Sequence, residues 1–150
     1  MSIRKVTTED IGPLAELFDA YRVFYGKTSD LQAASVFLED RISGVEAHVY
    51  ADFNKEEKMT GFILLYPLYS STRMKKLWLL NDLYVHPDFR GNGISKKLLD
   101  RAKTLCKQSK ACALMLETDK TNTIGNTLYL AEDFHLDTEH HYYTWENSSL

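Results

Sequence analysis

The chain has 150 residues, of which 44% are hydrophobic and 26% charged, as in an ordinary folded domain with one core. A net charge of −3 argues against nucleic acid as the main partner, because phosphate binding needs a basic surface. No apolar run approaches the roughly 18–20 residues of a membrane span, and the N-terminus MSIRKVTTED lacks the apolar core of a signal peptide. The sequence therefore predicts a single cytoplasmic domain over residues 1–150, with neither nucleic acid nor membrane as a partner.

Helical and strand periodicities alternate along the chain and indicate an α/β domain. Helix caps and stops place four helices, which run from Thr7–Asp10 to Gly26, from Ser29 or Asp30 to Gly44, from Ile94 to Cys106, and over roughly 123–132. Apolar and alternating segments predict strands at 3–6, 47–52, 61–68, 77–85, 113–118 and 141–146. The charged stretch 54–58 reads as a hairpin turn.

Two of these segments, 61–68 and 77–85, are continuous apolar runs, as expected of central strands buried on both faces. The second run is interrupted in its middle by Asn81 and Asp82. The two cysteines, Cys106 and Cys112, fit no metal motif and are too few for a disulfide framework. The His140-His141 pair has no carboxylate or cysteine at ligand spacing, so no metal is expected.

The stretch RGNGIS (90–95) joins the strand 77–85 to the helix that follows it. A strand, a glycine-rich turn and a helix N-terminus together offer free backbone amides and the positive end of a helix dipole. Gly91 and Gly93 permit positive φ and a close backbone approach, while Ser95 and Lys96 add a donor and a charge. The expected ligand of this turn is a phosphate or pyrophosphate group. Neither the dinucleotide fingerprint nor the P-loop pattern is present.

The surrounding stretch NDLYVHPDFRGNGISKKLL resembles the acetyl-CoA-binding motif of the GCN5-related N-acetyltransferase (GNAT) family, V-x-P-x-x-R-x-x-G-x-[GA]. Val85, Pro87, Arg90 and Gly93 fit this motif in register. Ser95 stands at the last small position, where the family usually has Gly or Ala.

A second block resembles the family's N-x-x-A-x-x-L-Y-x-x-x-G-F pattern. Its positions hold Asn122, Gly125 (for Ala), Leu128, Tyr129, Asp133 (for Gly) and Phe134. The resemblance covers roughly residues 60–145 and looks closest to small histone/polyamine-type acetyltransferases. The spermidine/spermine acetyltransferases look more distant, since they have an acidic pair where Asn81 and Asp82 stand here.

The resemblance implies a GNAT fold, with a mixed, mostly antiparallel sheet of about six or seven strands flanked by about four helices. The fourth and fifth strands, here 77–85 and 113–118, should splay apart, and a bulge near Asn81-Asp82 could begin that splay. Family members are often homodimers, and the aromatic C-terminal segment 141–146 could supply the interface.

The resemblance further implies acetyl-CoA as co-substrate and a set of site residues. The turn would bind the pyrophosphate, the backbone of 83–85 would pair with the pantetheine arm, and Tyr129 would protonate the departing thiolate. Asn122 would contact the pantetheine or simply cap its helix. The expected cofactor-binding residues are Leu83, Tyr84, Val85, Arg90, Gly91, Asn92, Gly93, Ile94, Ser95, Lys96, Asn122 and Tyr129.

The general base is left open by the sequence. Polyamine acetyltransferases have a glutamate where Asn81 stands, and an amide cannot act as a base. Asp82 either replaces it, or helps hold the ammonium, or is a structural acceptor for loop amides. His86 is an alternative base or an ordinary loop residue. Aromatic side chains can hold an ammonium but more often form a core. The acceptor-site candidates are Tyr21, Phe24, Tyr25, Trp78, Asn81 and Asp82.

The predicted function is direct transfer of an acetyl group from acetyl-CoA to a primary amine in a ternary complex. The expected acceptor is a small-molecule amine, such as a polyamine or an amino acid, with protein lysine or an N-terminus second. Two alternatives are a catalytically weak acyl-CoA sensor, suggested by Asn81, and an interaction domain that kept only the fold.

Overall fold

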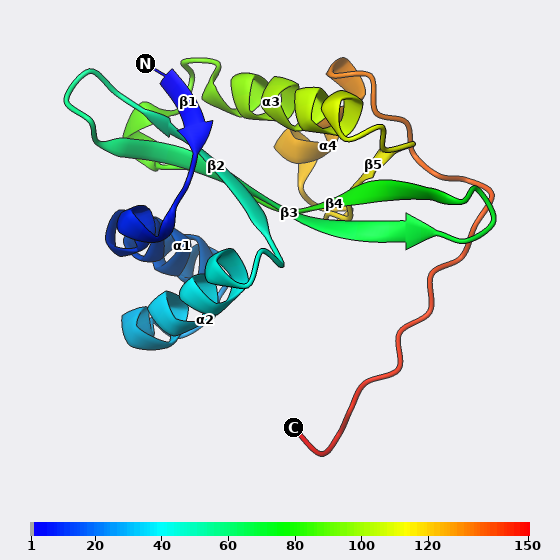
Figure 1. The fold of residues 1–150 in the computed structure, drawn as a ribbon, viewed down its shortest axis with the longest axis horizontal. Coiled ribbons are helices and arrows are strands. Elements are labelled where there is room, and N and C mark those ends of the chain that lie inside the picture. Colours follow the sequence, from blue (N-terminus) through cyan, green and yellow to red (C-terminus); the bar gives the residue numbers. More distant parts are fainter. Residues whose placement is uncertain (1) are drawn as a thin grey trace. The chain divides into compact units, whose positions relative to one another are not determined.

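A five-stranded mixed sheet organises the first of the two units into which the chain divides (Figure 1). The computed structural model describes residues 2–150; the first unit ends at Glu117 and the second is Thr118–Leu150. The strands are β1 (Ser2–Lys5), β2 (His48–Phe53), β3 (Met59–Ser70), β4 (Lys75–Val85) and β5 (Leu114–Met115). They lie in the sheet in chain order. Neighbours are antiparallel except β4 and β5, which are parallel.

The helices form where the sequence predicts them. Those of the first unit are α1 (Ile11–Phe24), α2 (Leu31–Ser43) and α3 (Ile94–Gln108), with two 3-10 turns, η1 (Thr8–Asp10) and η2 (Pro87–Phe89). The carboxylate of Asp30 caps α2 by accepting the Ala33 amide at 3.0 Å. None of the helices between residues 2 and 150 is long and apolar enough to cross a membrane.

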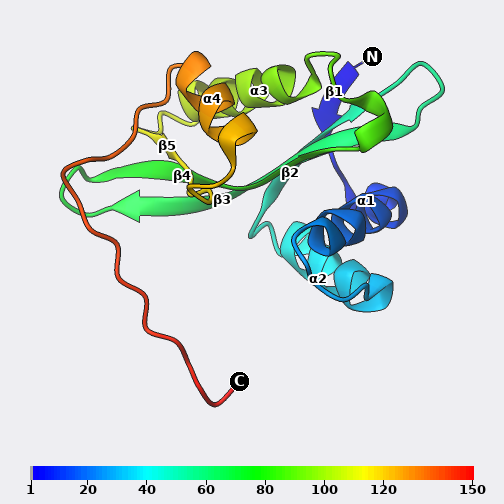
Figure 2. The ribbon, with the colours of Figure 1, turned by 180° about the vertical axis from the view of Figure 1, so that it is seen from behind.

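The two faces of the sheet are covered by different helices. In both views α1 and α2 lie on one face and α3 on the other (Figures 1 and 2). On the first face, Leu14 and Phe18 of α1 pack with Phe62 and Leu64 of β3 in one buried cluster. On the other, α3 buries the stripe of Ile94, Leu98, Leu99, Ala102 and Leu105. Because both faces of β3 are covered there, its residues Met59–Leu65 are all buried. The rest of the run predicted over 61–68 is half-buried at 66–67 and exposed at Leu68.

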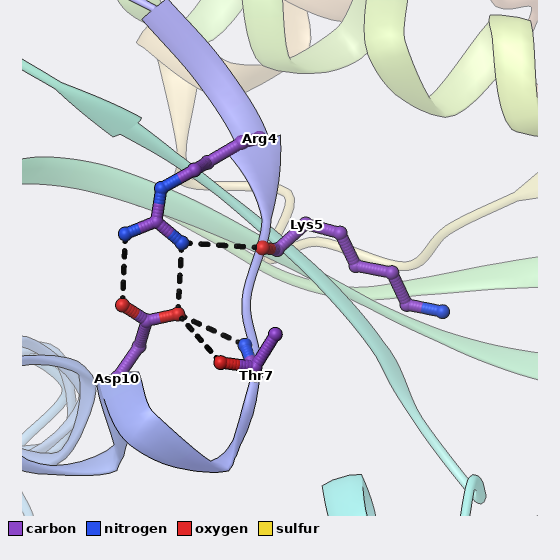
Figure 3. Close-up of polar contacts among 4 residues, drawn as sticks. All are labelled: Arg4, Lys5, Thr7 and Asp10. Atoms are coloured by element: carbon purple, nitrogen blue, oxygen red, sulfur yellow. Dashed lines mark hydrogen bonds and ion pairs between the residues drawn. The ribbon is translucent and has the colours of Figure 1, made fainter.

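An ion pair fixes the connection between β1 and α1. The Arg4 guanidinium donates from both terminal nitrogens to the Asp10 carboxylate at 2.9 Å each, and the Thr7 amide donates to the same carboxylate at 2.9 Å (Figure 3). These hydrogen bonds, the one from Arg4 first, hold the pKa of Asp10 below its ordinary value. The chain therefore turns sharply from the edge of the sheet into the first helix.

The sheet is smaller than the predicted six or seven strands. The predicted strand 113–118 reduces to Leu114 and Met115, which pair only with Trp78 and Leu79 of β4. The physical reason is a bulge in β4 immediately beyond Leu80, which bends the strand and ends the pairing.

The second unit contains one helix, α4 (Thr123–Ala131), and an extended C-terminal segment. The predicted strand 141–146 is wrong for this structure, since residues 132–150 contain no strand. Strand-forming residue types are present there, but a strand also needs a hydrogen-bonding neighbour. Large aromatic side chains are left exposed along this segment, namely Tyr142, Tyr143 and Trp145.

Candidate active site

A bulge on β4 sets which side chains reach the candidate site. Asp82 is opposite Leu64 of β3, but Leu80 is opposite Leu65, so Asn81 is an extra residue with no partner on β3. The bulge expected near Asn81-Asp82 is confirmed. In a regular strand alternate residues share a face, and one extra residue reverses that order.

Because of the bulge, Trp78 and Asp82 lie on opposite faces of the sheet. Asp82 and Tyr84 face α1, where the Tyr84 ring lies 5.6 Å from the ring of Tyr21. Trp78 faces α3 instead, and its Nε1 donates to the Ser109 hydroxyl at 2.8 Å. Trp78 is 1% exposed. It is a core residue beneath α3 and does not join the other acceptor-site candidates.

Asp82 is a buried carboxylate held by two neighbours. Its Oδ2 accepts a hydrogen bond from Asn81 Nδ2 at 3.0 Å, and the Tyr21 side chain also hydrogen-bonds to it. Burial raises the pKa of Asp82, and the bonds from Asn81 and Tyr21 offset part of that rise. Asp82 is therefore a stronger base than an exposed aspartate, and Asn81 orients it.

A pocket of about 220 Å³ opens over this carboxylate on the α1 side of the sheet. Its lining residues are Phe18, Tyr21, Arg22, Tyr25, Lys27 and Asp82. Three predicted acceptor residues, Tyr21, Tyr25 and Asp82, are thus brought together. Phe24 lies beside the pocket lining, with its ring 6.4 Å from that of Tyr84, and Asn81 contributes through its bond to Asp82.

The lining also includes Phe18, Arg22 and Lys27, which were not among the predicted acceptor-site residues. Phe18 and Arg22 stand at positions i and i+4 on α1, with Tyr21 and Tyr25 at i+3 and i+7. Helical spacing from the two predicted tyrosines would have found both, because such residues share one face.

Beyond the bulge, β4 has an open edge. Since β5 pairs with Trp78 and Leu79 alone, the part of β4 from Leu80 to Val85 has no strand partner on that side among residues 2–150. Leu83 and Val85 are half-buried there and Tyr84 is buried. An exposed strand edge of this kind can pair with an extended ligand through backbone hydrogen bonds.

The turn after β4 has the backbone shape that its glycines allow. Gly91 and Gly93 have φ of +79° and +73°, in the left-handed region. Gly93 is the N-cap of α3 and has no side chain with which to cap it. Asn92 donates to the Phe89 carbonyl at 3.0 Å, which folds its side chain back onto the turn.

Arg90 ties this turn to the end of β4. Its Nε donates to the Val85 carbonyl at 2.9 Å, and its guanidinium lies 5.5 Å from the ring centroids of both Tyr84 and Phe24. The turn is therefore anchored between the open edge of β4 and the C-terminal end of α1. Ser95 is half-buried and Lys96 is exposed in the first turn of α3.

His86 caps the loop after β4 and does not line the pocket around Asp82. Its Nδ1 accepts the Asp88 amide at 3.2 Å and so caps η2. The side chain is absent from the pocket lining around Asp82.

Comparison with known proteins identifies the family. Residues 14–146 match the Acetyltransferase (GNAT) family. The chain belongs to this family. It is 40% identical to an uncharacterized N-acetyltransferase of Bacillus subtilis, YhfO, over 92% of each chain. It is 27% identical to a probable acetyltransferase of Haemophilus influenzae over 78% of this chain and 80% of the other. A crystal structure of a probable acetyltransferase matches with a TM-score of 0.95 and 34% identity, covering 99% of each chain.

As a GNAT enzyme, the protein is an N-acetyltransferase, and the family implies acetyl-CoA as its co-substrate. The turn fits that molecule on its own chemistry. Two left-handed glycines, an uncapped N-terminus of the 15-residue helix α3 and an exposed Lys96 together suit a pyrophosphate. A Cβ placed on Gly91 or Gly93 would meet no atom within 4 Å, so the space above the turn is open.

The second GNAT block lies in the second unit. Asn122 caps α4, because its Oδ1 accepts the Gly125 amide at 3.0 Å and its Nδ2 donates to Thr118 Oγ1 at 2.9 Å. A Cβ on Gly125 would meet the Asn122 side chain in its present position, so an alanine there would require that side chain to shift. Tyr129 is half-buried on α4, with its ring 5.7 Å from that of Phe134.

The second departure from the family pattern, an aspartate in place of glycine at position 133, is compatible with the local backbone. Asp133 stands where the family usually has glycine and adopts φ of +66° just after the end of α4. Aspartate is among the few other residues that tolerate this conformation, because its short polar side chain can bond locally.

Proposed function

We propose that this GNAT enzyme transfers the acetyl group of acetyl-CoA directly to a primary amine of a small molecule that binds against Asp82. The observation that carries the proposal is the buried Asp82 carboxylate, oriented by Asn81 and Tyr21 on the strand whose edge opens at Leu80. Asp82 lines an aromatic pocket, and the part of β4 that β5 leaves unpaired begins beside it, which supports the proposal.

Asp82 has two roles in this proposal. Its negative charge holds the incoming ammonium, and its raised pKa suits it to accept a proton before or during attack, directly or through water. Tyr21 and Tyr25 provide ring faces and edges around the amine, where cation–π contact adds to binding. Asn81, which cannot take a proton, orients the neighbouring base.

The co-substrate would be held by the residues of the turn and of the β4 edge. Residues 90–96 would bind its pyrophosphate through backbone amides, and the backbone of 83–85 would pair with its pantetheine arm. Asn122 caps α4, and Tyr129 on the same helix would donate a proton to the departing thiolate. These roles follow from the family motif on these positions.

Transfer in a single ternary complex fits the state of the cysteines. Cys106 is half-buried, and burial raises the pKa of its thiol, so little nucleophilic thiolate forms at neutral pH. Among acceptors, small amines such as polyamines and amino acids stand first, and protein lysines or N-termini second. The motif's likeness to histone/polyamine-type enzymes admits both groups.

Release of free CoA thiol from acetyl-CoA should be followed across a panel of amines. The panel comprises spermidine, spermine, lysine, other amino acids, aminoglycosides and a histone-tail peptide. Amine-dependent release is expected and would identify the acceptor class. If no amine in the panel causes thiol release but CoA still raises the melting temperature, the result would favour an acyl-CoA sensor. A ligand raises the melting temperature only if it binds the folded state.

We further propose that the enzyme is a homodimer assembled through the C-terminal segment 141–146. Tyr143 and Trp145 are 92% and 84% exposed, which is unusual for large aromatics that no partner covers. The sheet ends at the two-residue strand β5, so a second copy could add this segment to its edge.

Light scattering on a sizing column should give twice the mass of the chain. The double variant Tyr143→Ser/Trp145→Ser should be monomeric, whereas Ile124→Ser, also at an 84% exposed position, should remain a dimer. A monomeric parent protein would rule the interface out.

A further inference from the structure

The pocket over Asp82 is lined by charges of both signs, and this limits the chemical classes of amine that can serve as the acceptor. Asp82 lies at its buried wall, while Arg22 and Lys27, from the end of α1 and the turn after it, also line the pocket. An acceptor that carried only positive charge would bind Asp82 and be repelled by two cations.

Arg22 has hydrogen-bond donors that no residue of the described chain accepts. Its Nη1 donates to the Thr28 carbonyl at 3.2 Å and lies 3.7 Å from Asp19 Oδ1. No residue among 2–150 hydrogen-bonds to its Nε or Nη2. An arginine with N–H groups unused on two nitrogens is the side chain best suited to a carboxylate, which it binds through paired hydrogen bonds.

Asp19 offsets part of the Arg22 charge across 3.7 Å but leaves the Arg22 Nε and Nη2 donors unused. Its oxygens already accept the Ser29 hydroxyl at 2.6 Å and the Asp30 amide at 2.8 Å, and it is not part of the pocket lining. Its role is to fix the α1–α2 turn that carries Lys27. The Lys27 ammonium has no ion pair with any residue that the structure describes, so it adds to the pocket a cation that no carboxylate pairs with.

Resting on the proposed function, we infer that the acceptor is an amino acid: its amine binds Asp82 and its carboxylate binds Arg22 and Lys27. The pocket volume of about 220 Å³ is a space for a small molecule. Phe18, Tyr21 and Tyr25 also line the pocket, and their aromatic rings would contact the acceptor's carbon skeleton. A polyamine and a protein lysine both lack the carboxylate that the cations would bind.

The test compares amino acids with the amines that differ from them only by loss of the carboxylate. L-Lysine is paired with 1,5-diaminopentane and L-phenylalanine with phenethylamine, and each of the other standard amino acids is paired in the same way. In any pair that turns over, kcat/KM should be at least tenfold higher for the amino acid.

Substitution of the cations then assigns the preference to them. Arg22→Gln and Lys27→Gln should each lower kcat/KM for the amino acid about tenfold to a hundredfold, mainly through KM, as expected when a charged hydrogen-bond donor is lost. The same variants should not lower kcat/KM for the matched amine and should raise it, because they remove a cation that repels its ammonium. Arg22→Lys, which keeps the charge, should retain part of the preference.

Two outcomes overturn the inference, and they are distinguishable from failure of the proposed function. Equal or better turnover of the carboxylate-free amine shows that the enzyme is an amine acetyltransferase without this specificity. An equal loss on both members of a pair in Arg22→Gln shows that the arginine supports only structure. If no amine releases CoA thiol, the proposed function itself fails and this inference with it.

Discussion

Trp78 and Asp82 stand four residues apart on β4 and yet face opposite sides of the sheet. In a regular strand both would point the same way. The single extra residue at Asn81 reverses the alternation, buries the indole under α3 and turns the carboxylate toward α1. The same bulge ends the pairing with β5. One insertion therefore creates both the acid in the pocket and the open edge beside it.

Asp82→Asn should lower kcat/KM by about a hundredfold or more, because it removes a general base at nearly constant side-chain size. In the parent enzyme kcat/KM should rise as pH rises through the raised pKa of Asp82, since only the carboxylate accepts a proton. That part of the pH profile should vanish in the variant. Asp100→Asn, on the exposed face of α3, is the control. An unchanged profile in Asp82→Asn would remove Asp82 from the mechanism.

The same variant should be more stable than the parent at high pH. Burial raises the pKa of Asp82 above its ordinary 3.8, so between these two values the folded state binds the proton that the unfolded state has released. Stability is therefore lost as pH rises through this window, and asparagine avoids the loss. Melting temperatures measured from pH 4 to 8 should separate in favour of the variant as pH rises. A less stable variant at pH 8 would mean that hydrogen bonds to the carboxylate outweigh its burial.

Gly93→Asp should abolish CoA binding, and Gly93→Asn provides the matched comparison. Both side chains tolerate the left-handed backbone at φ +73°, and nothing lies within 4 Å of the new Cβ. Only the aspartate adds a negative charge beside a pyrophosphate. Affinity for CoA, measured calorimetrically, should be at least about tenfold weaker in Gly93→Asp than in Gly93→Asn. Equal affinities would contradict an anion site at this turn.

Tyr129→Phe should depress kcat at least about tenfold while CoA affinity stays unchanged. The substitution removes the phenol that would protonate the thiolate, and the ring remains to pack against Phe134. Tyr69→Phe, at a 74% exposed position on β3, should behave as the parent enzyme. Full activity in Tyr129→Phe would assign that proton to another donor.

The Arg4–Asp10 ion pair should contribute modestly to stability. Arg4 is nearly half exposed, so a double-mutant cycle with Arg4→Gln and Asp10→Asn should give a coupling of about 0.5–1 kcal/mol. Because the pair lowers the pKa of Asp10, this contribution is present above the ordinary value of 3.8 and is lost as pH falls through the folded-state value. Denaturant unfolding at pH 7 and pH 3 should show the coupling at the first pH and a smaller one at the second. Additive effects at pH 7 would mean that the connection to α1 is fixed by backbone alone.

The sequence by itself determined the local features of this protein. Helix periodicity and caps located all four helices, and the apolar runs located β3 and β4, because these patterns depend on neighbouring residues. The glycines of RGNGIS likewise specified the left-handed turn before α3. The motif around them pointed to acetyl-CoA and to the GNAT family.

Only the tertiary structure decided which distant side chains meet. The direction of Trp78 depends on how β4 pairs with β3, and the fate of 141–146 depends on a neighbouring strand, which no local pattern can specify. Arg22 and Lys27 are ordinary surface cations in the sequence. They line one pocket with Asp82 because α1 packs on the sheet and so brings together residues some 60 positions apart in the chain. The burial and the charges of the pocket then act on the same groups.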